Sequence, residues 1–293
     1  MGKYLEHITH RHHTGKDKMP MVLSIAGLDP SGGAGLLADI KAMHAQGVYA
    51  LGVASCNTIQ TDQCFDRLKW VRPAFINTSI KALSSRFNIQ AVKIGVIKNR
   101  TTLYRLLNAV HDCFPKIKVV WDPVFNATAG GRFFNMTRAD LKGENAAHWK
   151  AVLKRCTVVT PNAEEAAMLI RLLGLQKSPI KENEVNLNYL KPLLQSACCH
   201  APILLKGGHL GNNAPEDWLF FYEPVKDQFQ TQCFISKAGA VDKAFKKHGS
   251  GCVHSSIVTA QLALGSSLQI AAQVAKEYME SFLSSSKGLL GVH

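Results

Sequence analysis

Short apolar runs recur along the chain, and helical patterns separate most of them. The runs are VLSIAG (22–27), ALGVASC (50–56), AVKIGVI (91–97), KVVWDPV (118–124), TVVTPN (157–162) and PILLKGG (202–208). Strands that are apolar almost throughout and alternate with helices are typical of a parallel sheet covered on both faces. Right-handed crossovers between such strands predict a three-layer α/β fold with a mostly parallel central sheet.

The remaining patterns extend this plan without dividing it. The runs DWLFFYEP (217–224) and QFQTQCFIS (228–236) predict a hairpin at the edge of the sheet, and helices are expected to begin near Gly251 and Leu268. No long linker rich in proline, glycine or serine interrupts the series, and no repeat is visible. Residues 21–293 are therefore predicted to form a single domain.

The segment 1–20 is polar and rich in histidine, with His7, His10, His12 and His13 close together. We interpret it as a flexible tail, since chain termini without apolar residues have little to dock with. A metal site is the alternative interpretation, although no cysteine or carboxylate cluster accompanies the histidines to complete a coordination shell. The segment also lacks the apolar stretch of a signal peptide.

Composition excludes several classes of protein. The 293 residues are 46% hydrophobic and 19% charged, which provides for a sizeable core and gives no sign of global disorder. No apolar run approaches the roughly 18–20 residues that cross a bilayer, so a cytoplasmic protein is expected. The eight cysteines form no C-x-x-C pair, which argues against a zinc site, a redox motif or a disulfide scaffold.

The chain is basic, with 34 Lys and Arg against 21 Asp and Glu and a formal net charge of +13. Such an excess is compatible with nucleic-acid binding. The positive charges are dispersed, however, and attraction for phosphorylated small molecules explains them equally well. We expect neither a nucleic-acid nor a membrane partner.

In open parallel sheets, ligands bind beyond the carboxyl ends of the strands. A glycine-rich segment follows the first predicted strand of this chain. In AGLDPSGGAGLLAD (26–39), Gly32, Gly33 and Gly35 permit close approach of the backbone, and Asp39 lies on the following helix. The segment matches neither a P-loop nor a clean G-x-G-x-x-G motif. A plain strand-to-helix turn with a solvated Asp39 is the alternative.

A second glycine-rich turn, HGSGCVHSS (248–256), opens a helical run. Gly249 and Gly251 flank Ser250, so backbone amides can turn inward at the helix start and, with the helix dipole, form an anion hole. Cys252 falls in the first turn, where a thiol pKa is typically lowered, and it could act as general base. A glycine-bounded helix start with a buried cysteine is the alternative.

Polar residues also follow three other strands. Asn162 and Glu165 are three positions apart, so on a helix they share a face and their oxygens suit a hydrated Mg²⁺. The alternative is that Asn162 is the N-cap of the helix and Glu165 complements its dipole. Lys206 ends a strand and can supply a point charge for phosphate, or it reaches solvent from a turn. Asp122 in WDPV can hold a metal-bound water or merely end the strand.

The motifs SIAGLDPSGGAGLLADIKA, CNTIQT, KIGV, WDPV, TPNAEEA, LLKGGH and GSGC, in this order, resemble those of the ribokinase-like superfamily. Within it, the chain is most similar to the hydroxymethylpyrimidine/phosphomethylpyrimidine kinases of thiamine biosynthesis, over roughly residues 21–285. The resemblance implies an ATP- and Mg²⁺-dependent kinase that phosphorylates the hydroxymethyl group of a small pyrimidine. It also implies a homodimer, because relatives commonly dimerise through sheet-edge surfaces.

Carried over motif by motif, the resemblance implies roles for individual residues. The pyrimidine pocket would be lined by Gly27, Ala34, Asp39, Gln60 and Val96. The metal and the nucleotide would be organised by Asp122, Glu165, Asn162 and Lys206. The anion hole and the base would be formed by Gly249, Ser250, Gly251 and Cys252. A cysteine at that last position is shared with the pyrimidine kinases and with some pyridoxal kinases, whereas the sugar kinases carry an aspartate there.

Several positions depart from the usual pattern of these kinases. Leu28 replaces a small polar residue, Leu37 stands where glutamine is common, and the segments DPVFNATAGG and IQTDQCFD are also unusual. These changes concern the pocket and its flap more than the phosphate-binding residues. A pyridoxal-type vitamin B6 kinase therefore stays open as an alternative, as does a pyrimidine sensor without turnover. A second phosphorylation, of the monophosphate, is also left open.

Overall fold

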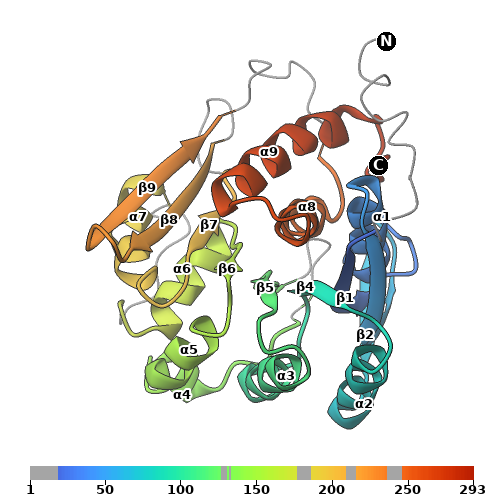
Figure 1. The fold of residues 1–293 in the computed structure, drawn as a ribbon, viewed down its shortest axis with the longest axis horizontal. Helices are drawn as coiled ribbons and strands as arrows, with labels where there is room; N and C mark the ends of the chain where they lie inside the picture. Colours follow the sequence, from blue (N-terminus) through green and yellow to red (C-terminus); the bar gives the residue numbers. More distant parts are fainter. Residues whose placement is uncertain (1–18, 127–130, 132, 177–185, 209–215, 236–245) are drawn as a thin grey trace.

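A single sheet runs through the described part of the chain, with its strands in the order β3-β2-β1-β4-β5-β6-β7-β8-β9 (Figure 1). The computed structural model describes residues 19–126, 131, 133–176, 186–208, 216–235 and 246–293. The strands are β1 (Met21–Leu28), β2 (Tyr49–Gln60), β3 (Phe65–Trp70), β4 (Ile89–Ile94), β5 (Lys118–Trp121), β6 (Val158–Val159), β7 (Ile203–Leu205), β8 (Asp217–Glu223) and β9 (Gln228–Phe234). Strands β2, β1, β4, β5, β6 and β7 run parallel, and β3, β8 and β9 are antiparallel additions at the two edges.

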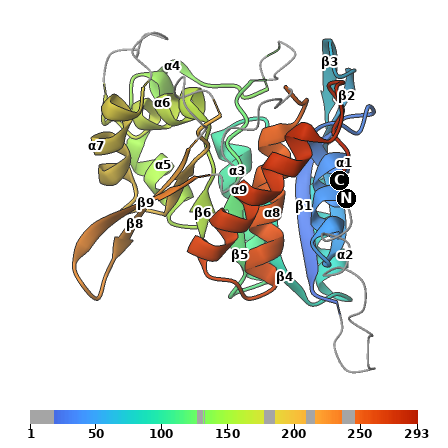
Figure 2. The ribbon, with the colours of Figure 1, turned by 90° about the horizontal axis from the view of Figure 1, so that it is seen from above.

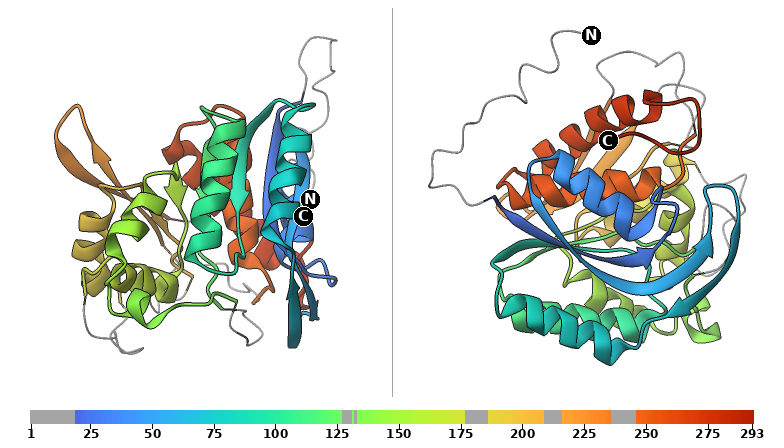
Figure 3. Two further views of the ribbon diagram at one scale, coloured as in Figure 1. Left: turned by 90° about the horizontal axis from the view of Figure 1, so that it is seen from below. Right: turned by 90° about the vertical axis from the view of Figure 1, so that its right-hand side faces the viewer.

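Helices cover both faces of this sheet, which confirms the three-layer α/β fold (Figures 1 and 3). One face carries α1 (Gly35–Ala45), α8 (Ser250–Ala263) and α9 (Leu268–Ser284). The opposite face carries α2 (Pro73–Ser84), α3 (Arg100–Cys113), α4 (Arg138–Leu141), α5 (Ala146–Leu153), α6 (Ala163–Leu172) and α7 (Leu187–Ala197). The expected tail lies almost wholly outside the described residues, so its division from the domain stays a prediction.

The central strands are apolar because both of their faces are covered. In β1 the six inner residues are all buried, and the one polar side chain among them, Ser24, has a hydrogen-bond partner. The larger core lies against α2, α3, α5, α6 and α7, where Trp121 stacks on Trp149 at a centroid distance of 6.1 Å. A second core lies between the sheet and the α8–α9 pair. Helix α8 is therefore fixed along its length, and only its N-terminus meets the carboxyl edge of the sheet.

The edges differ from the sequence prediction in length and pairing. The second strand does not end at Cys56 but continues to Gln60 and turns back into β3 as an antiparallel hairpin, which projects beyond the neighbouring strands in Figure 2. Strands β6 and β7 are shorter than predicted, at two and three residues. The hairpin β8–β9 extends the opposite edge, as the sequence predicts.

Candidate active site

The N-terminus of α8 presents its first backbone amides at the carboxyl edge of the sheet. Its N-cap, Gly249, is left-handed with φ of 74°, its first turn has no acidic residue, and within the described part of the chain no side chain caps the helix. The first amides of a helix have no intrahelical partner, so an uncapped start can bind an anion. A Cβ at Gly249 would lie 2.2 Å from the carbonyl oxygen of Gly33, so only glycine allows this approach of the two glycine-rich turns.

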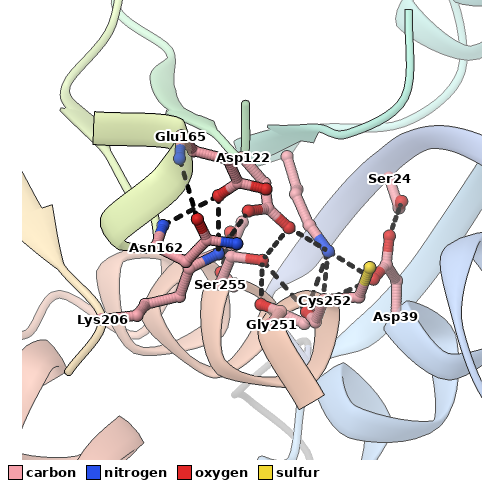
Figure 4. Close-up of polar contacts among 12 residues, drawn as sticks. Ser24, Asp39, Asp122, Asn162, Glu165, Lys206, Gly251, Cys252 and Ser255 are labelled. Atoms are coloured by element: carbon pink, nitrogen blue, oxygen red, sulfur yellow. Dashed lines mark hydrogen bonds and ion pairs between the residues drawn. The ribbon is translucent and has the colours of Figure 1, made fainter. Parts of the chain in front are cut away.

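Lys206 reaches this helix start from the end of β7. Its ammonium group donates to Asp122 Oδ1 at 2.7 Å and lies 3.7 Å from Glu165 Oε2 (Figure 4). A Cβ at Gly251 would lie 3.1 Å from the same Nζ atom. Burial alone would lower the pKa of Lys206, but the two carboxylates outweigh it and raise this pKa. A fixed positive charge therefore lies directly beside the amides of α8.

Asp122, just after β5, joins Lys206 to the helix. It is fully buried, and its Oδ2 accepts a hydrogen bond of 2.9 Å from Ser255 on the second turn of α8. Burial by itself raises the pKa of a carboxyl group, yet the charges of Lys206 and Lys93 hold the pKa of Asp122 below its usual value. Both oxygens of Asp122 are thus engaged with groups of the protein.

Asn162 and Glu165 form the N-cap of α6. The side chain of Asn162 accepts from the Glu165 amide, and Glu165 Oε2 accepts from the Asn162 amide, each at 2.8 Å. This reciprocal arrangement is a capping box, and it includes the N-cap role of Asn162 that was one of the two interpretations in the sequence analysis. Burial, with Asp122 nearby and Lys206 opposing, raises the pKa of Glu165 to about 7. Its carboxylate thus remains within reach of the Lys206 ammonium while it caps the helix.

Lys93, inside β4, is a site residue that the sequence analysis did not identify. It has no exposed surface, forms an ion pair with Asp39, and donates to the carbonyl of Cys252 at 2.8 Å and to Ser256 Oγ at 3.1 Å. Its Nζ also lies 3.8 Å from Asp122 Oδ2. A signal was present in the sequence, since a lysine within an apolar strand is almost never buried without a partner.

Asp39, on α1, lies beneath the glycine-rich turns. Both carboxylate oxygens are engaged, by Lys93, by Ser24 at 2.6 Å and by Ser256 at 2.9 Å, and the residue has no exposed surface. The expectation that Asp39 itself lines a pocket is not met in this arrangement. Asp39 instead fixes the start of α8 through Lys93 and Ser256.

Cys252 lies between the starts of two helices, because a backbone hydrogen bond from Gly35 on α1 reaches its thiol. Burial raises the pKa of Cys252 to about 12; Lys93 opposes this shift, whereas Asp122 and Asp39 reinforce it. The expectation of a lowered thiol pKa is therefore wrong. The helix dipole is outweighed by the loss of solvation and by the two buried carboxylates.

The other expected pocket residues lie around the ends of β1, β2 and β4. A Cβ at Gly27 would lie 3.7 Å from Val96 Cβ, so these two residues are in contact distance of each other. Ala34 lies against Gly249, since a Cβ added to Gly249 would be 2.6 Å from the Cα of Ala34. Gln60 lies farther out on the β2–β3 hairpin, on the same face as Thr58, whose hydroxyl donates to the carbonyl of Leu28 at 2.9 Å. The structure thus groups Gly27 with Val96 and Ala34 with Gly249, with Gln60 on the hairpin.

These residues fit a nucleotide with a hydrated cation better than a bare metal. A side chain at Gly251 would meet the Lys206 ammonium group, so glycine lets this cation lie beside the α8 amides, and the two together can bind phosphate oxygens. Among the described residues, no three His, Cys, Asp or Glu side chains are grouped as metal ligands. Asp122 and Glu165 can still hold Mg²⁺ through water, since Mg²⁺ often uses one or two carboxylates together with phosphates.

The three-layer sheet has the ribokinase-like fold, and a helix start and a buried lysine meet at its carboxyl edge. The family model for phosphomethylpyrimidine kinase matches residues 29–291. The chain therefore belongs to the phosphomethylpyrimidine kinase family, and it is a kinase. No helix in the described part of the chain has the length and apolar character needed to span a bilayer.

Individual relatives agree with this assignment. The chain is 32% identical over 269 residues to the hydroxymethylpyrimidine/phosphomethylpyrimidine kinase of Rhizobium meliloti, with 92% of each chain covered. It is 27% identical to a chloroplastic thiamine biosynthetic bifunctional enzyme of Arabidopsis thaliana, of which it spans about half, 48% of the length. The pyridoxal kinase of Staphylococcus aureus, solved with AMP-PCP and pyridoxal, shares the fold with a TM-score of 0.70 at 21% identity, over 92% of this chain and 89% of that one.

Proposed function

We propose that this protein transfers the γ-phosphoryl group of ATP to the hydroxymethyl oxygen of 4-amino-5-hydroxymethyl-2-methylpyrimidine, and then a second phosphoryl group to the monophosphate. The family assignment and the named activity of the Rhizobium meliloti relative support this substrate. The observation that carries the proposal is the position of Lys206 beside Gly251, at the uncapped start of α8. A cation and free amides at one point suit a migrating phosphoryl group.

Catalysis then rests mainly on position and on fixed charge. The amides of residues 249–252 point at the place where negative charge develops, and Lys206 neutralises phosphate oxygens beside them. Preorganised donors of this kind typically contribute about 10²–10³ in rate each. Asp122, Asn162 and Glu165 hold Lys206 and the surrounding loops in place. Mg²⁺ would be held by the nucleotide phosphates and, through water, by Asp122 and Glu165, where it would offset phosphate charge.

Cys252 has a role compatible with a protonated thiol. To act as a base, Cys252 would have to be a thiolate, but with a pKa of about 12 the thiol stays protonated at neutral pH. Phosphoryl transfer demands little of a base, because its transition state is largely dissociative in most analyses. We therefore assign Cys252 to orient the hydroxymethyl group, whose proton would pass late in the step to an oxygen of the transferred phosphoryl group. Cys252→Ser should then keep more activity than Cys252→Ala, whereas equal losses with an altered pH profile would support a thiolate base.

The heterocycle occupies the space between the first glycine-rich turn and the β2–β3 hairpin. Gly27 and Ala34 supply backbone without bulk, Val96 supplies an apolar wall, and Gln60 pairs with the aminopyrimidine edge. Asp39 acts from beneath, by fixing Lys93 and the start of α8.

A parallel assay of ADP formation tests this proposal. The protein, with ATP and Mg²⁺, is offered hydroxymethylpyrimidine, its monophosphate and pyridoxal in separate reactions. The pyrimidine should give the highest kcat/KM, and Lys206→Met should abolish turnover while the exposed Lys226→Met keeps it. A strong preference for pyridoxal would identify a vitamin B6 kinase instead, the second candidate suggested by the Staphylococcus aureus neighbour. Binding of the pyrimidine without turnover of any substrate would identify a sensor.

We also propose a homodimer formed through the β2–β3 edge of the sheet. Strand β3 is an edge strand, and Ile59 and Phe75 near it are 57% and 64% exposed. Sedimentation analysis tests this assignment: Ile59→Lys together with Phe75→Lys should give a monomer, and a monomeric parent protein would refute the proposal.

A further inference from the structure

A buried histidine joins the two glycine-rich turns of the site. His248 is 6% exposed, and its Nε2 lies 2.9 Å from Asp29 Oδ2. Asp29, 1% exposed, in turn accepts from the amide of Ala34 at 3.0 Å and from the amide of Ser31 at 2.9 Å. The first turn is therefore organised around Asp29, and His248, the residue just before Gly249, ties this turn to the start of α8.

A buried lysine joins the same loop to segment 285–293. Lys247 is 2% exposed. Its ammonium group donates to the carbonyl of Ser286, to the hydroxyl of Ser286 at 2.7 Å and to the carbonyl of Gly288 at 2.7 Å. The backbone amide of His248 donates to the carbonyl of Leu289 at 2.9 Å. The loop that leads into α8 is thus held from its outer side by four hydrogen bonds to segment 285–293.

Side-chain packing completes this contact. A Cβ at Gly33 would lie 2.6 Å from Leu290 and 2.8 Å from the ring of His248, so Gly33 is enclosed by both residues. Segment 285–293 is also fixed to α9, because the ring of His293 packs on Phe282 at 4.9 Å. Figure 1 shows the end of the chain beside α1, next to the first glycine-rich turn.

We propose that Lys247 and His248 are positioning residues, through which segment 285–293 and the turn at Asp29 hold the anion hole of residues 249–252 in register with the substrate pocket. This inference rests on the proposed function and deepens it. Neither residue needs to touch the nucleotide or the pyrimidine. Their effect is on the placement of amides that act mainly on the migrating phosphoryl group, so their loss should lower kcat more than it raises either KM.

The kinetic test compares two lysines that donate to backbone carbonyls near opposite ends of α8. Lys247→Met should lower kcat by about tenfold to a hundredfold, since misplacement of catalytic groups by about 1 Å has effects of this size. Lys118→Met is the control, because Lys118 donates to the carbonyl of Leu262 at 2.8 Å near the far end of α8. It should lower thermal stability while leaving kcat unchanged. Equal kcat losses in both variants would overturn the positioning role.

A second measurement is independent of turnover. Hydrogen exchange of the Val253 amide, which donates to the carbonyl of Gly249, should accelerate in Lys247→Met and in His248→Ala. His248→Gln, which keeps a donor toward Asp29, should restore part of the protection. Unchanged exchange in the first two variants would overturn the proposal. If the wild-type protein transfers phosphate to none of the acceptors, the proposed function fails, and exchange alone decides whether Lys247 and His248 position this loop.

Discussion

Lys93 and Asp39 form an ion pair in which neither side chain has any exposed surface. The pair lies under the first turn of α8, where Lys93 also holds the carbonyl of Cys252. Burial alone would lower the pKa of Lys93, but the carboxylates of Asp39 and Asp122 raise it, while burial raises the pKa of Asp39 itself. The pair supports the start of α8 from a position without solvent exposure.

Lys93→Met should strongly destabilise the protein, because it leaves the Asp39 carboxylate buried without its cation. Breaking one partner of a buried pair typically costs about 3–5 kcal/mol. Urea unfolding measures this loss. The double variant Lys93→Met with Asp39→Asn should be less destabilised than the sum of the two single variants, and simple additivity would contradict a direct coupling.

Gly249→Ala and Gly265→Ala separate backbone strain from close approach. Both glycines have positive φ, 74° and 90°, but a Cβ at Gly265 would meet nothing within 4 Å, whereas at Gly249 it would lie 2.2 Å from Gly33. Each substitution should cost about 1–2 kcal/mol through the left-handed backbone. Only Gly249→Ala should also lower kcat, because it forces the two turns apart. Comparable kcat in both variants would show that this contact is not needed.

Cys252 should react slowly with iodoacetamide. Because its pKa is about 12, the thiolate fraction near pH 8.5 is small, whereas the exposed Cys64 and Cys199 are accessible to the reagent. Peptide mass spectrometry after timed alkylation gives the three rates separately. Rapid modification of Cys252 at neutral pH would indicate a thiolate and would revive its role as a base.

Glu165 should make stability fall as pH rises from about 4.5 to about 7. The folded protein keeps the proton of Glu165 up to about pH 7, whereas the unfolded chain loses it near 4.5, so raising the pH within this window favours unfolding. In Glu165→Gln this component should vanish, while the capping box is preserved because glutamine also serves there. Denaturant unfolding at several pH values tests this; identical pH dependence in both proteins would contradict the raised pKa.

The central sheet was predictable because its strands are apolar on both faces. VLSIAG and AVKIGVI correspond to β1 and β4, and the glycine-rich turns after β1 and before α8 fall at one edge of the sheet, as parallel topology requires. The hairpin partner β3 was not predicted. Its sequence, FDRLKW, is mostly polar because it is an exposed edge strand, and such a run does not differ from a loop.

Site chemistry was predictable only where the chain itself sets the geometry. The position of Asn162 just before a helical run is enough to indicate an N-cap, whereas the return bond from Glu165 that completes the capping box was not predicted. The pKa of Cys252 was not predictable, since it depends first on burial and then on Lys93, Asp122 and Asp39, which lie far away in sequence. The contact between His248 and Asp29 spans 219 positions and has no local signature.

The sharing of Lys206 between Asp122 and Glu165 bears on which anions the site can select. Above about pH 7, where Glu165 is ionised as well as Asp122, Lys206 would offer little net attraction to a lone phosphate or sulfate ion. A phosphate chain with a divalent counter-ion would bring opposite charges to the ammonium and to the carboxylates at once. As the proposed phosphate site, this arrangement would favour metal-complexed over free nucleotide, a selectivity that a solitary exposed lysine could not supply.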